Sequence, residues 1–147
     1  MRAVTLIAVG MLAATAAHAQ PGPGPREFIN DAIEGDNAEV MFGRMAVLRS
    51  RDPDIRAYGR MLQADHNQAK AQAIRVGRRY HVRPSLGLPG EAIAERRRLE
   101  RMNGRAFDRE FVDYMIEDHQ KDIDKFQAAT RFEGPAGRLA EQTLPTL

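Results

Sequence analysis

The amino-acid sequence predicts an all-α fold in which long helices form a bundle and shorter helices are added to it. From Arg26 onward, apolar side chains recur with a helical period of about 3.6 residues, and no stretch shows strand alternation of any length. Helix-start and helix-stop signals, such as Asp52-Pro53 and Asn103-Gly104, divide this pattern into segments joined by short loops. Long amphipathic helices bury their apolar faces against one another, so a helical bundle follows.

The first two predicted helices are long segments that lie before residue 81. We expect the first to run from about residue 27 to residue 49, and Gly35-Asp36-Asn37 marks a place where it could kink or break. Asp52, as an N-cap, and Pro53, as the first helical residue, predict the start of the second helix, which extends to about Tyr80. Their apolar faces carry Phe28, Ala32, Phe42 and Ala46 in the first helix, and Ile55, Tyr58, Leu62, Ala69, Ala73 and Val76 in the second.

The second half of the chain predicts one long helix and two short ones. Residues 84–90 form a loop, and a short helix over residues 91–102 is ended by Asn103-Gly104. The last long helix begins near Phe107 and continues to about Thr130. Gly134-Pro135 then opens a final short helix through Ala140. The stripe of the last long helix is formed by Phe107, Phe111, Tyr114, Met115, Ile123 and Phe126.

The N-terminal segment has the pattern of a secretory signal. Arg2 precedes the nearly unbroken apolar run 4–17, and Ala17-His18-Ala19 is a small-residue cleavage site. The sequence therefore predicts a signal peptide over residues 1–19, a Pro/Gly-rich spacer over 20–26, a helical domain over 27–147 and export to the periplasm. The alternative is an uncleaved N-terminal anchor, for which the run is short compared with the about 20 residues of a membrane span.

Composition narrows the function classes further. The chain has no cysteine, which excludes disulfides and thiolate metal sites. Its 22 Lys and Arg residues nearly balance 20 Asp and Glu residues, so net charge does not predict a nucleic-acid partner. No second stretch is apolar enough to span a bilayer, and homo-oligomerisation or association with the envelope stays open. The basic run Arg96-Arg97-Arg98 is interpreted as a solvated face, with an anionic lipid or polyanion contact as the alternative.

Two Asp-His pairs, Asp65-His66 and Asp118-His119, lie within the apolar patterns of two long helices. At about 100° per residue, His66 lies about 40° from Leu62, and Asp65 lies on the other flank of the stripe. The two members of a pair cannot easily both point at one centre, so we expect the two histidines to converge, with Glu39 as the favoured carboxylate ligand and the two aspartates in support. Each of the three long helices directs ionisable groups inward, and the candidate metal ligands are His66, His119, Glu39, Asp65, Asp118 and Asp122.

Imidazole and carboxylate groups suit zinc, iron, manganese or copper. Thioethers for copper could come from the methionines, although Met at helical spacing is typical of a core; the candidates are Met41, Met45, Met61 and Met115. The alternative to a metal is a buried hydrogen-bond network between histidine and carboxyl groups. No Ser-His-Asp arrangement, phosphate loop or dinucleotide fingerprint is present, which leaves enzymatic activity open and favours a non-enzymatic protein.

Three segments and the closing residues of the chain resemble a known family. The segments are 35–40, 58–69 with its Asp65-His66, and 104–119 with its Asp118-His119, and the close is residues 143–147. They are similar to a large bacterial family of exported, ferritin-like helical domains of unknown function, often labelled "predicted outer membrane protein". The resemblance implies a ferritin-like, up-down four-helix bundle and a periplasmic or envelope location. It implies no established activity.

The sequence departs from the ferritin pattern in one respect. Di-iron enzymes of that class use a Glu-x-x-His spacing, whereas Gln63 lies three residues before His66 and Ile116 lies three before His119. This argues against a ferroxidase or a di-iron oxygenase. Three hypotheses therefore remain: a periplasmic metal-binding bundle, a non-catalytic envelope or stress-related protein with a buried polar network, and a metal-dependent hydrolase or redox enzyme.

Overall fold

The computed structural model describes residues 23–147. The predicted signal peptide over residues 1–19 and the first three residues of the spacer, 20–22, lie outside the described residues. The elements are α1 (Pro25–Arg49), α2 (Pro53–Arg79), α3 (Gly90–Leu99), α4 (Gly104–Ala129), α5 (Pro135–Thr143) and a 3-10 turn over Leu144–Thr146. Helices account for every regular element in this part of the chain, which confirms the predicted all-α fold.

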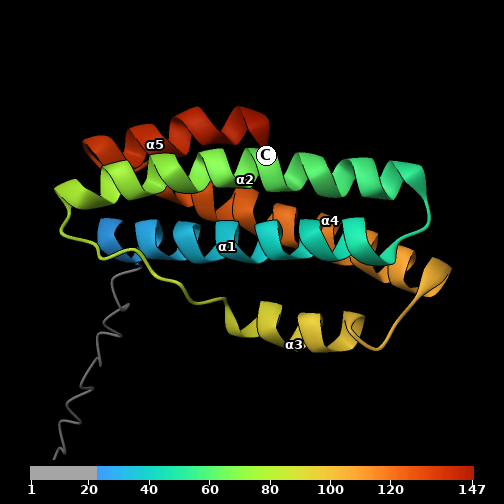
Figure 1. Cartoon of the computed structure of the whole chain (residues 1–147). Coiled ribbons are helices and arrows are strands. Elements are labelled where there is room, and N and C mark those ends of the chain that lie inside the picture. The colour runs from blue at the N-terminus through green and yellow to red at the C-terminus, as the bar shows by residue number, and fades with distance from the viewer. Residues whose placement is uncertain (1–22) are drawn as a thin grey trace, which may run out of the picture.

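The long helices lie side by side as a bundle (Figure 1). A short link joins α1 to α2, and these two helices run antiparallel and share the most extensive contact in the molecule. The other long helix, α4, packs on α1, while the short helix α5 packs against α2 and α4. None of the helices within residues 23–147 is both long enough and apolar enough to cross a membrane.

The predicted start of the second helix at Asp52-Pro53 is confirmed. The Asp52 carboxylate accepts hydrogen bonds from the backbone N–H of Asp54 at 2.8 Å and of Ile55 at 3.4 Å, and Pro53 is the first residue of α2. Other boundaries move by a few residues. α3 ends at Leu99, α4 begins as early as Gly104, and α5 extends to Thr143.

The expected kink at residues 35–37 is wrong, because α1 is continuous through them. Asn37 does not compete for the helix backbone. Its amide instead donates to the carbonyl oxygens of Ser85 and Gly87, both at 3.1 Å, in the loop between α2 and α3. Asp36 is buried toward α2, where it pairs with His66. In an isolated segment, the polar side chains of Asp36 and Asn37 would favour a turn. In the folded chain they instead contact α2 and the loop that follows it.

Two apolar clusters fill the bundle, and a polar layer separates them along each long helix. One cluster includes Ile33 of α1, Ala73 of α2 and Phe126 of α4, and the other includes Phe42, Leu62 and Met115 of the same helices. The ionisable residues of the interior fall between these positions on all three helices. They are Asp36 and Glu39 on α1, His66 on α2, and His119 and Asp122 on α4.

The contact between α1 and α2 depends on two facing glycines. A Cβ atom added to Gly43 would lie 2.5 Å from the carbonyl oxygen of Gly59, and one added to Gly59 would lie 2.6 Å from that of Gly43. Gly43 is one helical turn after Glu39, so this close approach lies next to the polar layer. We expect Gly43→Ala to lower the free energy of unfolding by about 1–3 kcal/mol through overpacking, as measured by chemical denaturation.

Gly35→Ala is the matched control for this prediction, because Gly35 also lies inside α1 and a Cβ there would be 3.7 Å from Asp122 Oδ2, an ordinary contact distance. An alanine at position 43 that left stability unchanged would contradict the proposed close packing of α1 on α2.

Candidate metal centre

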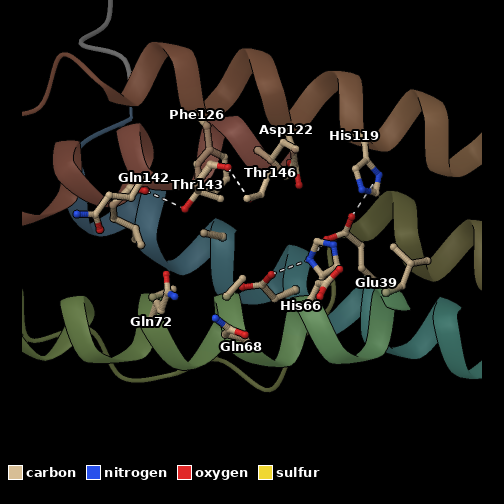
Figure 2. Close-up of a pocket in the computed structure, with 18 of the residues that line it drawn as sticks. Glu39, His66, Gln68, Gln72, His119, Asp122, Phe126, Gln142, Thr143 and Thr146 are labelled. Carbon is tan, nitrogen blue, oxygen red and sulfur yellow. Dashed lines mark hydrogen bonds and ion pairs between the residues drawn. The ribbon is translucent and has the colours of Figure 1, made fainter. Parts of the chain in front are cut away.

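Three residues from three helices meet in the polar layer. Glu39 of α1, His66 of α2 and His119 of α4 each offer a ligand atom, and these atoms all lie within 4.8 Å of one another. The two imidazole rings are 5.8 Å apart between centroids and nearly perpendicular, at 89°. Figure 2 shows the Glu39 carboxylate between the two histidines. The structure therefore brings together the three residues for which the sequence predicted convergence.

His66 is held by two carboxylates at one ring nitrogen. Its Nδ1 lies 2.9 Å from Asp36 Oδ1 and 2.6 Å from Glu39 Oε2. Burial disfavours the charged imidazole, but the hydrogen bonds to Asp36 and Glu39 outweigh it and raise the pKa of His66 to about 10. Burial raises the pKa of Asp36 to about 6, against the lowering effect of His66. At neutral pH this pair is therefore an imidazolium facing the Asp36 carboxylate.

His119 is oriented by its own helix. Its Nδ1 lies 2.9 Å from the carbonyl oxygen of Met115, one turn earlier, and 3.5 Å from Glu39 Oε1. In a neutral ring, an Nδ1–H donated to that carbonyl leaves Nε2 as the acceptor nitrogen. The His119 side chain is 22% exposed, compared with 10% for His66, so it forms the more accessible wall of the site.

Glu39 is the most deeply buried member, with 1% of its surface exposed. Its Oε2 contacts His66, but its Oε1 has no hydrogen-bond partner among the described residues and is shielded from solvent. A buried carboxylate oxygen without a partner is costly, and native proteins contain few of them. This oxygen is directed at the ring of His119 and is the unsatisfied atom of the polar layer.

The other predicted ligands lie around this centre and not in it. Asp65 is exposed on α2, and Asp122 is buried but forms an ion pair with Lys125 at 2.8 Å. Asp118 is partly buried, and neither it nor Asp65 forms a hydrogen bond or ion pair with a histidine within residues 23–147. Asp36 was missed by sequence reasoning, although its position three residues before Glu39 places it on the same face of α1.

A cleft of about 330 Å³ opens beside the three residues (Figure 2). Glu39, His66 and His119 are part of its lining, which continues along α2 toward α5. Polar groups from three elements line the cleft, namely Gln68, Gln72, Gln142, Thr143 and Thr146. A small molecule or ion can therefore reach the buried layer from solvent.

Asp118 allows a test of how the acids in this layer affect stability. Burial raises its pKa from 3.8 to about 7, and the nearby carboxylates of Glu39, Asp122 and Glu91 add to this, against the effect of Lys125. The folded state thus holds the proton more tightly than the unfolded state, so stability is lost as pH rises from about 4 through 7. We expect Asp118→Asn to stabilise metal-free protein by about 2 kcal/mol more at pH 8.5 than at pH 5.

Denaturation in EDTA at both pH values measures this difference. The control is Asp65→Asn, an aspartate in the equivalent pair whose carboxyl group is exposed, and here the two pH values should give nearly the same change. Equal effects of the two substitutions would contradict the buried environment assigned to Asp118.

Comparison with known proteins gives one match. Residues 10–147 match the model of a family described as a domain of unknown function. No curated protein and no solved structure matches the chain. The chemistry of the site is therefore argued from its geometry.

Proposed function

The chain belongs to the DUF4142 family, a domain of unknown function, and from its buried histidine and carboxylate groups we propose that it binds a divalent transition-metal ion. The ligands are Glu39, His66 and His119. We assign this binding to the periplasm on the basis of the N-terminal sequence pattern. The ferritin-like relationship of the bundle is part of the same proposal and rests on the sequence resemblance.

The observation that carries the proposal is the Glu39 carboxylate. It is almost fully buried between two imidazoles, and its Oε1 has no hydrogen-bond partner within the described residues. A polar network that served only to fix helix register would be expected to satisfy this oxygen. A cation at this position would satisfy it. The site also contains two carboxyl groups, from Asp36 and Glu39, that face the single imidazolium of His66. A divalent ion would offset this excess of acidic groups.

The separations suit a metal after small side-chain movements. Ligand atoms bonded to one tetrahedral ion at about 2.1 Å stand about 3.4 Å apart. The three ligand atoms lie within 4.8 Å of one another, so movements of about 1 Å suffice. Asp36 and the Met115 carbonyl each engage a histidine Nδ1, the nitrogen that Glu39 also approaches, and we assign them as the partners that orient the two rings.

Nitrogen and oxygen ligands suit zinc, iron, manganese or copper. Of the four methionines that could supply thioethers, only Met61 lines the cleft, while Met41, Met45 and Met115 belong to the apolar cluster. This favours a site built from imidazole and carboxylate. Catalytic zinc sites have three protein ligands and keep one coordination position open for water or another external ligand. The three residues beside this open cleft resemble that arrangement.

A metal titration tests the proposal. Protein stripped with EDTA is titrated with Zn²⁺, Mn²⁺, Cu²⁺ and Co²⁺, the last giving a visible absorption spectrum that reports its ligand geometry. We expect one ion per chain and, with metal at about 100 times its Kd, a stabilisation of about 2.7 kcal/mol, visible as a higher melting temperature. Absence of binding, with unchanged melting for every ion, would favour the alternative of a non-catalytic envelope or stress-related protein with a structural polar network.

A further inference from the structure

Positive charge is concentrated in one part of this nearly balanced chain. Residues 66–90 contain five Lys or Arg residues and no Asp or Glu, whereas the whole chain has 22 basic and 20 acidic residues. Most of these basic residues lie on the C-terminal half of α2, near the start of α5. Such segregation raises the local positive potential and favours anionic partners.

The structure gathers part of this charge around a hollow of about 300 Å³ between α2 and α5. Three arginines line it, Arg75 and Arg79 from α2 and Arg138 from α5, and no acidic residue contributes to the lining. We call this hollow the arginine groove. Its remaining lining is apolar apart from one amide and consists of Val76, Pro135, Leu139 and Gln142.

The three guanidinium groups have no ion-pair or side-chain hydrogen-bond partner in the part of the chain that the structure describes. Arg75, Arg79 and Arg138 are exposed, and none forms an ion pair or a side-chain hydrogen bond within residues 23–147. The sequence before residue 23 contains no Asp or Glu that could neutralise them. Arg75 and Arg79 lie one helical turn apart and repel each other, so the folded chain keeps an uncompensated cluster of like charge.

The chemistry of the groove identifies a class of ligand. Guanidinium groups present planar pairs of N–H donors that match phosphate oxygens, and several of them around one hollow can bind one doubly charged group. The groove reaches Pro135, the first residue of α5, where the helix dipole adds to the attraction for an anion. Val76 and Leu139 offer an apolar surface to the organic part of an ester.

We propose that the arginine groove binds a phosphate-ester group, carried by a soluble molecule or by a lipid headgroup. The groove shares Leu139 and Gln142 with the lining of the cleft, but none of its residues is one of the three proposed metal ligands. It would give the protein a second ligand site along the same face of α2.

The test measures binding of phenyl phosphate and of inorganic phosphate by calorimetry, in EDTA and at constant ionic strength. We expect phenyl phosphate to bind, and either Arg79→Gln or Arg138→Gln to weaken it about tenfold or more, since each removes charge-assisted hydrogen bonds. Arg78→Gln is the matched control. Arg78 is also an exposed arginine of α2 and its substitution changes the net charge equally, but it does not line the groove.

A second arm separates the two sources of the phosphate group. Phosphatidylcholine vesicles with and without phosphatidic acid are tested for co-flotation with the protein and with the same three variants. Binding to phosphatidic acid alone, lost in Arg79→Gln and kept in Arg78→Gln, would support the groove with a lipid headgroup as ligand. Binding to neither probe, or equal loss in Arg78→Gln and Arg79→Gln, would overturn the proposal, because it would reveal no site or only general surface charge.

Discussion

His66→Ala is expected to lower the affinity for the metal ion by about 1000-fold. Changes to groups that only orient a ligand cost about 10–100-fold, so the loss of a ligand should exceed this range. His66 is also the cationic partner that Asp36 and Glu39 share in the interior. Its removal would leave both carboxyl groups without an imidazolium partner and destabilise the fold. Competition with a chromophoric chelator gives the affinity, measured well below the melting temperature of the variant.

Two further variants make this result specific. His119→Ala removes the other imidazole but leaves the pairing of His66 with Asp36 in place, so its loss of affinity cannot be attributed to that pair. His81→Ala removes an exposed histidine beyond the end of α2, outside the cleft, and should bind metal as the unmodified protein does. Undiminished affinity in both His66→Ala and His119→Ala would rule out the proposed centre.

Glu39→Gln is expected to weaken metal binding by about 100-fold or more and, at the same time, to stabilise the metal-free protein. The amide keeps the size of the side chain and an oxygen that can accept from His66. It removes a buried negative charge from a layer in which two carboxyl groups face one imidazolium. Because burying an excess charge is unfavourable, we expect the free energy of unfolding in EDTA at pH 7.5 to rise by about 1 kcal/mol.

This pair of measurements separates a binding site from a structural network. A carboxylate retained for metal binding lowers the stability of the metal-free protein, whereas one retained for helix register raises it. A clear loss of stability in Glu39→Gln, together with unchanged metal binding, would therefore assign Glu39 to the structural role. Glu27→Gln, in the exposed first turn of α1, is the control: it should leave metal binding unchanged and, because it removes an acid near the positive end of the helix dipole, slightly lower stability instead of raising it.

Much of the fold could be predicted from the sequence, because the signals for helices are local. Helical periodicity, the Asp52-Pro53 start and the Asn103-Gly104 break mark segments close to those observed. The same periodicity places Glu39, His66 and His119 on inward faces. In a bundle all inward faces meet in one interior, so their convergence could be anticipated without knowledge of the helix contacts.

Only the tertiary structure decided the partners of these groups. Periodicity gives the direction in which a side chain points from its helix, but not the axial position of one helix relative to the next. That axial position is set by contacts such as the close approach of Gly43 and Gly59. This axial position places Asp36 Oδ1 2.9 Å from His66 Nδ1 and leaves Glu39 Oε1 without a hydrogen-bond partner among residues 23–147.

The same reason applies to the features that sequence reasoning did not anticipate. α1 stays continuous because Asn37 finds acceptors in a loop about 50 residues later in the chain. The arginine groove exists because α5 places Arg138 beside two arginines of α2. By itself, the sequence determined an all-α chain with ionisable groups on the inner faces of three helices. The packing of those helices decided which groups meet, because contacts between distant residues are not encoded in any local pattern.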